Sequence, residues 1–174
     1  MQSTSPVDTG ARWLNQRAHP DLPGEAEREL RLAGLAWHRE VEAEAHLARA
    51  EVLAPGHLAV LIAHYRYHFY KHHYERARHF AGACLDAVGG QLGLPRAFEA
   101  VTSAHANFRG DDPLVRFWLF GMQAYGYVLL RLGEADLGRA VLEKITALDV
   151  DDHTKTRVLL QVIAQAGVED DDES

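Results

Sequence analysis

Histidine is the residue type in this chain with the clearest capacity for chemistry. Eleven histidines are present, and five of them lie in one stretch of sequence that also holds four of the six tyrosines. Three of them, His64, His68 and His72, are spaced four residues apart, so a helix places them along one face. Imidazoles at that spacing can share a metal ion, and histidine is a common ligand of zinc, nickel and copper. One interpretation is therefore a metal site that His73 or His79 completes.

The other interpretation is that these histidines pack and hydrogen-bond inside a helical protein. No glutamate follows His64 in the HExxH manner, and no acidic residue lies between Val60 and Tyr74. The only cysteine, Cys84, has no second thiol to join it in a metal site. Packing is the favoured interpretation, no cofactor is expected, and His64, His68 and His72 are weak candidates for metal ligands.

No arrangement of nucleophile and base stands out in the sequence. The serines and threonines lack a glycine-rich elbow, and no phosphate-binding loop is present. Acid pairs at Asp111-Asp112 and Asp151-Asp152 each adjoin an expected helix start, where acidic side chains favour the helix dipole. Capping explains these pairs, and an enzyme is not expected.

Composition indicates a soluble globular protein with one domain. The 174 residues are 47% hydrophobic and 25% charged, which is typical of soluble proteins and allows a sizeable core. No apolar run is long enough to span a membrane, and the first residues lack the pattern of a secretory signal. A lone cysteine excludes a disulfide framework within the chain. These features predict a cytoplasmic protein.

Much of the negative charge is in the last residues of the sequence. The formal net charge is −7, and residues 168–174 carry five acidic side chains. This balance argues against nucleic-acid binding, which requires clustered lysine and arginine. The acidic segment is predicted to be a disordered tail. Residues 1–23 are predicted to form an arm with one short helix around Trp13.

The apolar pattern predicts an all-α fold of about seven to eight helices. Apolar residues recur at spacings of three and four, and the alternation typical of strands is missing. The expected helices cover residues 25–37, 41–53, 58–71, 74–87, 95–106, 114–132, 136–148 and 154–166. Gly89-Gly90 is expected to end the fourth of them, and Asp112 with Pro113 to begin the sixth as N-cap and first-turn residue.

Small residues recur at a regular distance. Ala43 and Ala77 lie 34 residues apart, and Gly138 follows Ala77 by one such period plus 27 residues. On these residues the chain resembles the tetratricopeptide repeat (TPR) family, whose units are helix–turn–helix hairpins with small residues where the helices touch. The resemblance implies stacked antiparallel hairpins in an interrupted right-handed superhelix. Its repeats are expected at about 24–57, 58–91 and 119–152, with an intervening helix and loop at 92–118 and a C-terminal helix at 153–167.

Three positions depart from the TPR pattern. Tyr65 and His72 stand where glycines are common, and Val150 replaces the closing proline. The family's stacking principle still applies, because one hairpin alone cannot bury its apolar face.

The TPR register also implies a surface for a protein partner. It places Arg66, Phe69 and Tyr70 on the groove face of the second repeat, with His73 beside them. The comparable residues of the third repeat are Phe120, Gln123, Tyr127, Leu130 and Arg131, and of these Phe120, Gln123, Tyr127 and Arg131 are the candidate contacts. Aromatic and arginine side chains carry much of the binding energy at protein interfaces. The alternative is an aromatic core with a solvated arginine, and the recurrence in the third repeat favours the groove.

Two stretches have a narrower resemblance. LIAHYRYHFYKHHYERA (61–77) and RFWLFGMQAYGY (116–127) are similar to small TPR-like proteins of nitrogen-fixing bacteria, the group that includes nitrogenase-associated factor T. The resemblance carries over no functional residue. It implies a non-catalytic assembly, chaperone or maintenance factor that binds the nitrogenase molybdenum–iron protein. A general TPR adaptor for another client and a His-rich metal-binding protein are the alternatives.

Overall fold

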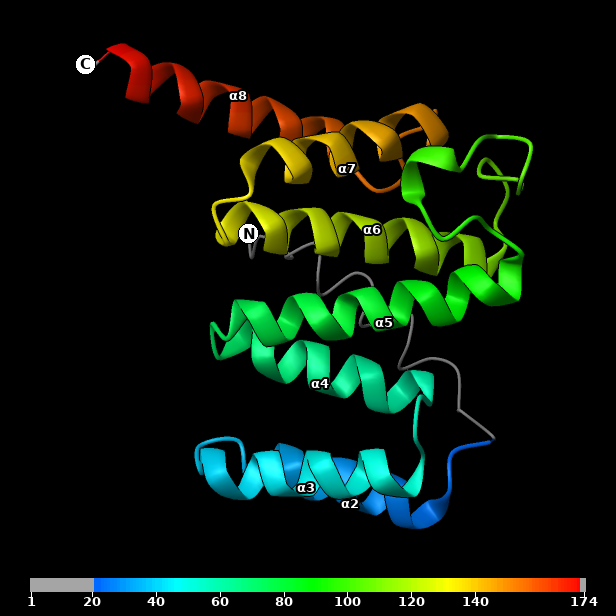
Figure 1. The fold of residues 1–174 in the computed structure, drawn as a ribbon, viewed down its shortest axis with the longest axis vertical. Helices are drawn as coiled ribbons and strands as arrows, with labels where there is room; N and C mark the ends of the chain where they lie inside the picture. The colour runs from blue at the N-terminus through cyan, green and yellow to red at the C-terminus, as the bar shows by residue number, and fades with distance from the viewer. Residues whose placement is uncertain (1–20, 173–174) are drawn as a thin grey trace. The chain divides into compact units, whose positions relative to one another are not determined.

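The protein is all-α throughout the part of the chain that the structure describes. The structure is a computed structural model that describes the backbone of residues 21–172 and the side chains as far as residue 165. Seven α-helices and one short 3-10 helix occupy this range, without a strand (Figure 1). The elements are α2 (Gly24–Leu35), α3 (Glu40–Leu53), α4 (Leu58–Tyr70), α5 (Tyr74–Leu92), η1 (Phe98–Ala100), α6 (Pro113–Arg131), α7 (Ala135–Leu148) and α8 (Thr156–Asp172). The predicted fold class is confirmed. The short helix predicted around Trp13 lies outside the described residues.

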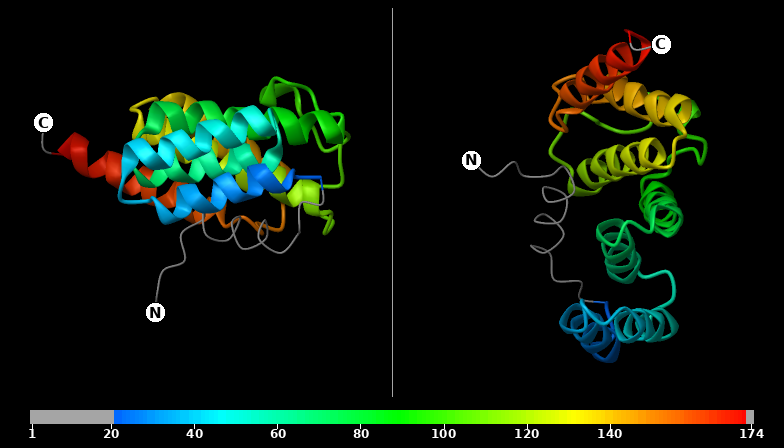
Figure 2. Two further views of the ribbon diagram at one scale, coloured as in Figure 1. Left: turned by 90° about the horizontal axis from the view of Figure 1, so that it is seen from below. Right: turned by 90° about the vertical axis from the view of Figure 1, so that its left-hand side faces the viewer.

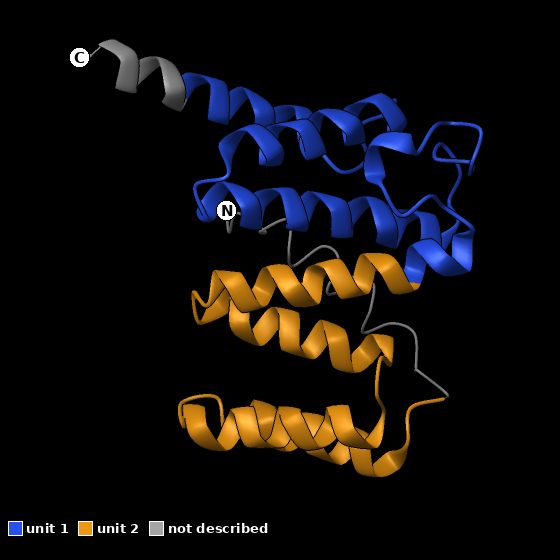
Figure 3. Ribbon diagram, viewed as in Figure 1, with its two compact units in different colours: residues 1–11, 88–174 blue, residues 12–87 orange. Residues whose placement is uncertain are grey.

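The helices belong to two compact units, which Figure 3 shows in different colours. Unit 2 is Arg12–Ala87 and contains α2, α3, α4 and most of α5. Unit 1 is Met1–Ala11 with Val88–Ser174 and contains the end of α5 and all later elements. The predicted superhelix concerns both units together and stays a prediction.

In unit 2, α2 and α3 form a hairpin (Figure 2). Four alanines, two from each helix, are at most 4% exposed: Ala26, Ala33, Ala43 and Ala50. Side chains of this size let two helices approach closely. Ala33 and Ala43 share a core cluster with Leu47 of α3 and Tyr67 of α4, so α4 packs onto the hairpin. The predicted small-residue contact at Ala43 is therefore present.

The turn after α4 has the hydrogen bonds of a Schellman motif. His73 N–H donates to the carbonyl of His68 at 2.8 Å, and His72 N–H donates to that of Phe69 at 3.1 Å. His72 has a φ of 60°, the left-handed conformation that usually belongs to glycine in this motif. The helix ends at Tyr70, so the prediction that His72 continues the line of His64 and His68 is wrong.

In unit 1, glycines allow α6 and α7 to touch. A Cβ atom on Gly138 would lie 2.9 Å from Cγ of Leu130 and 3.0 Å from the carbonyl oxygen of Gly126. Real Cβ atoms almost never approach other atoms this closely, so the close approach of α6 and α7 requires glycine at position 138. Asp112 is the N-cap of α6, where its carboxylate accepts from the N–H of Leu114 at 2.8 Å, as predicted.

The helix predicted to begin at Pro95 does not form. Only η1 is helical there, because other partners take the backbone groups. Lys144 of α7 donates to the carbonyls of Glu99 and Val101 at 2.7 and 2.8 Å, and the Thr102 N–H donates to His105 Nδ1 at 3.0 Å. Val101 is fully buried, so this loop packs inside unit 1 against α7.

Two helix ends also differ from the prediction. α5 continues through Gly89 and Gly90 to Leu92, because a glycine inside a helix costs only about 1 kcal/mol relative to alanine. The chain then turns at Gly93, whose φ is 67°. α8 runs to Asp172, past the end at residue 166 and into the segment predicted to be a disordered tail. Across the described residues, no helix combines the length and apolar character that crossing a membrane requires.

Candidate functional site

Two of the predicted histidines are buried in the centre of unit 2. His64 and His68 are 6% and 3% exposed. Both rings stack on Phe80 of α5, with centroid distances of 4.2 and 5.6 Å. His64 Nε2 lies 3.2 Å from the carbonyl oxygen of Leu47 and donates to it, while its Nδ1 is buried with no hydrogen-bond partner in the described residues. The expectation that these two side chains pack between helices is confirmed.

Burial determines the protonation state of both rings. The pKa of His68 is lowered to about 4, mainly by removal from water and in addition by charge repulsion from the neighbouring His64. Burial also lowers the pKa of His64, against the opposing attraction of the Glu51 carboxylate. His68 is therefore neutral at pH 7, with a nitrogen lone pair available to a partner.

The Schellman turn brings His73 back against His68. Their Nδ1 atoms lie 3.5 Å apart, and His73 Nδ1 is 4.0 Å from Oε1 of Glu44 on α3. Of the residues that the structure describes, Glu44, His68 and His73 form a group whose potential ligand atoms all lie within 4.8 Å of one another. Glu44 was not predicted, because it is distant from the histidines in the sequence and only the packing of α3 on α4 brings it near.

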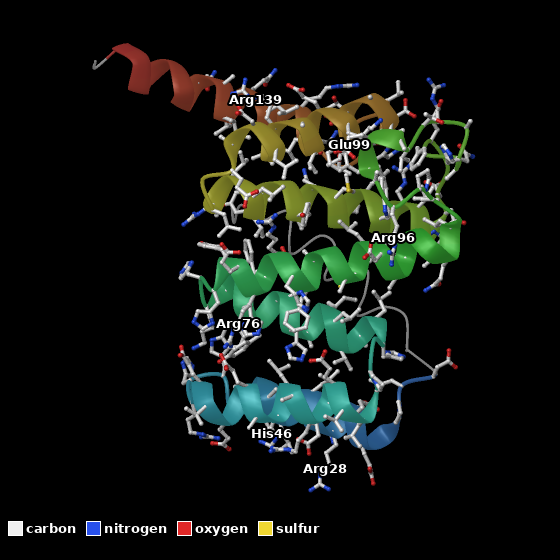
Figure 4. All side chains as sticks on the ribbon, viewed as in Figure 1. Arg28, His46, Arg76, Arg96, Glu99 and Arg139 are labelled. Atoms are coloured by element: carbon white, nitrogen blue, oxygen red, sulfur yellow. The ribbon has the colours of Figure 1, made fainter. Side chains whose placement is uncertain are left out.

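Arg76 orients the carboxylate of Glu44. It lies near the start of α5 (Figure 4), and its Nη1 donates to Glu44 Oε2 at 2.9 Å. The other oxygen, Oε1, is the one near His73. A cleft of about 240 Å³ adjoins this group, and its walls are formed by Glu44, Leu47, Ala48, His64, His68, Arg76 and Phe80. The site is thus partly open, with His68 at its inner side.

The other predicted histidines are not part of this group. His72 is exposed and its Nδ1 is 2.8 Å from the Tyr74 hydroxyl. His79 is also exposed, with its ring edge against Phe80. The structure therefore does not assemble His64, His68 and His72 as one metal site, because the left-handed turn at residue 72 directs that side chain elsewhere.

Two of the predicted partner-binding residues of unit 2, Phe69 and Tyr70, belong to a cluster of aromatic rings. The rings of Phe69 and Tyr70 are 5.6 Å apart, Tyr74 is 6.1 Å from Phe69, and Trp37 is 6.3 Å from Tyr70. Tyr70 is 39% exposed, and Arg66 and His73 are half-buried. Trp37 was predicted only as a helix residue. Its aromatic type next to the turn at residues 36–39 was the signal that the sequence offered.

The predicted residues of unit 1 do not all lie on a surface. Gln123 is 2% exposed and donates to the Thr154 carbonyl at 2.9 Å and to Thr156 Oγ1 at 3.1 Å. It is therefore a packing residue, and its prediction as a partner contact is wrong. Phe120 and Tyr127 are half-buried and Arg131 is exposed.

A buried carboxylate in unit 1 has a structural role. Asp149 is 1% exposed and accepts from Thr154 N–H and Oγ1 at 2.8 and 2.9 Å. Burial raises its pKa, but the hydrogen bonds from Thr154 and His153 outweigh burial and hold the pKa below its ordinary value. Asp149 thus closes the loop between α7 and α8. Cys84 is buried as well, and burial raises the pKa of its thiol to about 12, so the thiol stays protonated at neutral pH.

Comparison with known proteins shows a clear relative. The chain is 36% identical over 134 residues to a protein of Azotobacter chroococcum mcd 1 described as an uncharacterized 19.8 kDa protein in the nifW 5′ region. The match covers 76% of this chain and 75% of the relative. No protein-family model matches the chain, and no solved structure matches it.

Proposed function

This chain belongs to the same family as the nifW-region protein of Azotobacter chroococcum, and on that premise we propose that it is a non-catalytic, protein-binding factor of nitrogen fixation. The relative is encoded in a nitrogen-fixation gene region. The proposed client is the nitrogenase molybdenum–iron protein, in the cytoplasm, as the resemblance to nitrogenase-associated factor T implies. Assembly or maintenance of that client is the role that follows.

The observation that carries this proposal is the half-exposed aromatic cluster of unit 2. The rings of Trp37, Tyr70, Phe69 and Tyr74 follow one another at centroid distances of 5.6 to 6.3 Å. Surface aromatic groups of this kind anchor protein partners, because each ring buries a large area at little entropic cost. A solitary exposed ring needs no explanation, whereas a contiguous row favours a binding surface.

Exposed aliphatic residues also occur close to Trp37 in the sequence. Leu35 and Val41 flank Trp37 in the sequence and are 73% and 88% exposed. Lys71 lies over the Trp37 ring, 5.3 Å from its centroid, and its Nζ is 3.2 Å from Glu40 Oε1. An apolar centre with a charged border is the usual anatomy of a protein interface.

The hairpin architecture supports a TPR-like mode of binding. Ala43 and Ala77 are both fully buried, and Gly138 lies at a close helix contact, as the repeat register requires. In helical repeat proteins the exposed face of the stacked hairpins binds the partner. Phe120, Tyr127 and Arg131 of unit 1 are proposed as a second contact set, and Gln123 is left out.

Binding to purified nitrogenase molybdenum–iron protein tests this function. Intact and cofactor-deficient client are each mixed with the full-length chain, and complex formation is followed by size-exclusion chromatography with light scattering. We expect a complex with at least one form of the client. Tyr70→Ala and Arg66→Ala should each weaken it by about tenfold or more, since interface anchors contribute about 1–2 kcal/mol or more.

Val162→Ala on α8 is the matched control, because Val162 is 56% exposed and lies in unit 1. This variant should bind as the unaltered chain does. Failure of both forms of the client to bind would reject nitrogenase as the partner. Binding that Tyr70→Ala and Arg66→Ala leave unchanged would reject the aromatic cluster as the contact. Capture of a different, identified client through Tyr70 would favour a general TPR adaptor.

A further inference from the structure

We propose that Glu44, His68 and His73 bind one divalent transition-metal ion, with zinc as the reference case, where α3 meets the α4–α5 turn. Two imidazoles and one carboxylate are a ligand set that proteins use for zinc and for ferrous iron. This inference goes beyond the proposed protein binding and stands independently of it. It also differs from the line of His64, His68 and His72 that the sequence suggested.

The facing nitrogens of His68 and His73 are the first argument. Their Nδ1 atoms lie 3.5 Å apart. Two neutral imidazole lone pairs at this distance repel each other unless a proton or a cation lies between them. Metal–nitrogen bonds of about 2.05 Å at a tetrahedral angle place two ligand nitrogens about 3.4 Å apart. The observed spacing is close to that of two ligands of one ion, and without an ion a proton on one Nδ1 forms a hydrogen bond to the other.

The carboxylate of Glu44 supplies the negative charge. Oε1 is 4.0 Å from His73 Nδ1, and the ligand atoms of the three residues lie within 4.8 Å of one another, so a side-chain movement of about 1 Å brings the carboxylate into a first coordination shell. Its side chain is 35% exposed, which allows that movement. Oε2 accepts from Arg76 at 2.9 Å, and a second-shell donor of this kind fixes the orientation of a ligating carboxylate.

A backbone hydrogen bond closes the turn that holds His73. Its N–H donates to the carbonyl of His68 at 2.8 Å, so the backbone itself couples the two ligands. His68 is 3% exposed and stacked on Phe80, whereas the His73 side chain is 37% exposed. One ligand is thus held within the core and another is reachable from solvent, which gives the ion a path of entry. The adjoining cleft leaves room for water in the remaining coordination positions.

The fold alone does not require a histidine at position 68. The α6–α7 turn has the same hydrogen bonds, with Glu134 N–H donating to the carbonyl of Leu129 at 3.0 Å. Leu129 therefore occupies the position that corresponds to His68, and it is fully buried. A leucine satisfies the packing there, so a buried histidine at the same place in unit 2 indicates a role for its nitrogen.

Metal titration of the full-length chain, freed of any affinity tag and treated with EDTA, tests the inference. Zinc is titrated calorimetrically, and cobalt is titrated with visible absorption as the readout. We expect one equivalent to bind, a rise of several degrees in Tm with zinc, and cobalt absorption bands that report nitrogen ligation. His73→Ala and Glu44→Gln should each weaken zinc binding by at least about 100-fold, since even second-shell changes cost 10–100-fold.

His72→Asn is the matched control. It removes the neighbouring exposed imidazole and keeps a residue that accepts the left-handed conformation. This variant should bind zinc as the unaltered chain does. The inference is overturned if no equivalent binds, if His73→Ala binds zinc undiminished, or if His72→Asn loses binding to the same degree as His73→Ala. Circular dichroism of each variant confirms that the helices are retained, so a loss of binding reports the ligand.

Discussion

The turn between α4 and α5 in unit 2 and the turn between α6 and α7 in unit 1 have the same backbone hydrogen bonds. In each turn, one N–H donates to the carbonyl oxygen of the residue five positions earlier. The distance is 2.8 Å for His73 N–H and 3.0 Å for Glu134 N–H. Each also has a residue of positive φ, 60° at His72 and 80° at Gly133. The two hairpins therefore have the same turn geometry between their helices.

The residues in these two turns differ in a consistent way. Unit 1 has a buried leucine and a glycine, Leu129 and Gly133, which are the low-energy choices for those positions. Unit 2 has His68 and His72 in the corresponding positions. Unit 2 therefore has a buried polar residue and a strained backbone position where unit 1 has the favourable residues. Such unfavourable choices are expected at functional sites. Exchanging residues between the hairpins tests that comparison.

The largest expected effect is the acid sensitivity that His68 confers on metal-free protein. Its pKa is about 4 when folded and about 6.5 when unfolded. The unfolded chain binds the proton of His68 more readily than the folded chain does. The stability that neutral His68 provides is therefore fully present above pH 6.5 and is lost as the pH falls to 4. At pH 4 the loss amounts to about 3 kcal/mol in the free energy of unfolding.

Urea unfolding in EDTA at pH 7 and pH 5 measures this effect. His68→Leu, which introduces the residue of unit 1, should reduce the difference between the two pH values. The charged and titratable groups around His68 are Glu44, His64, His73 and Arg76, and all of them remain in the variant. An unchanged pH dependence in His68→Leu would contradict the assignment to this ring.

A second exchange concerns the small residue at the helix contact. Gly138→Ala introduces the residue of the corresponding position in unit 2, Ala77. The added Cβ would lie 2.9 Å from Cγ of Leu130 and 3.0 Å from the carbonyl oxygen of Gly126, which is closer than van der Waals contact. We therefore expect a loss of about 2 kcal/mol in the free energy of unfolding. Gly90→Ala is the control, since a Cβ there meets nothing within 4 Å, and it should stabilise by about 0.5–1 kcal/mol. Equal effects from both changes would show that the α6–α7 contact tolerates a methyl group.

The smallest exchange is at the positive-φ residue. His72→Gly introduces the residue type that Gly133 has in unit 1. It removes the strain of a side chain on a left-handed backbone, and it also removes the exposed hydrogen bond between His72 and Tyr74. The expected gain is about 0.5–1 kcal/mol, measured as an increase in the urea midpoint with an unchanged m-value. A loss of stability would mean that the His72 side chain contributes more than the strain it imposes.

Sequence periodicity was sufficient to predict the helices that pack as hairpins. The spacing of Ala43 and Ala77 follows from close helix contact, which is a local property repeated along the chain. The start of α6 was predictable because Asp112 caps it through neighbouring N–H groups. These features depend on residues within a few positions of one another.

The remaining features depend on partners distant in sequence. The segment after Pro95 has helix-forming residues, but the ammonium group of Lys144 takes two of its carbonyls. Gln123 has the sequence spacing of a surface residue, but its side chain is buried, where it donates a hydrogen bond to the Thr154 carbonyl. Glu44 joins the histidines only through the packing of α3. Periodicity reports which face of a helix is buried, and it carries no information on which distant polar group meets it.

The attachment of Lys144 has a consequence for chemical labelling. The chain has three lysines, at positions 71, 144 and 155. The amine of Lys144 is engaged by two carbonyl oxygens, that of Lys71 lies over the Trp37 ring beside Glu40, and Lys155 is exposed. Among the lysines, acylating reagents therefore modify Lys155 first. Delayed modification of Lys71 and Lys144, located by mass spectrometry of peptides after digestion, reports the integrity of each unit separately.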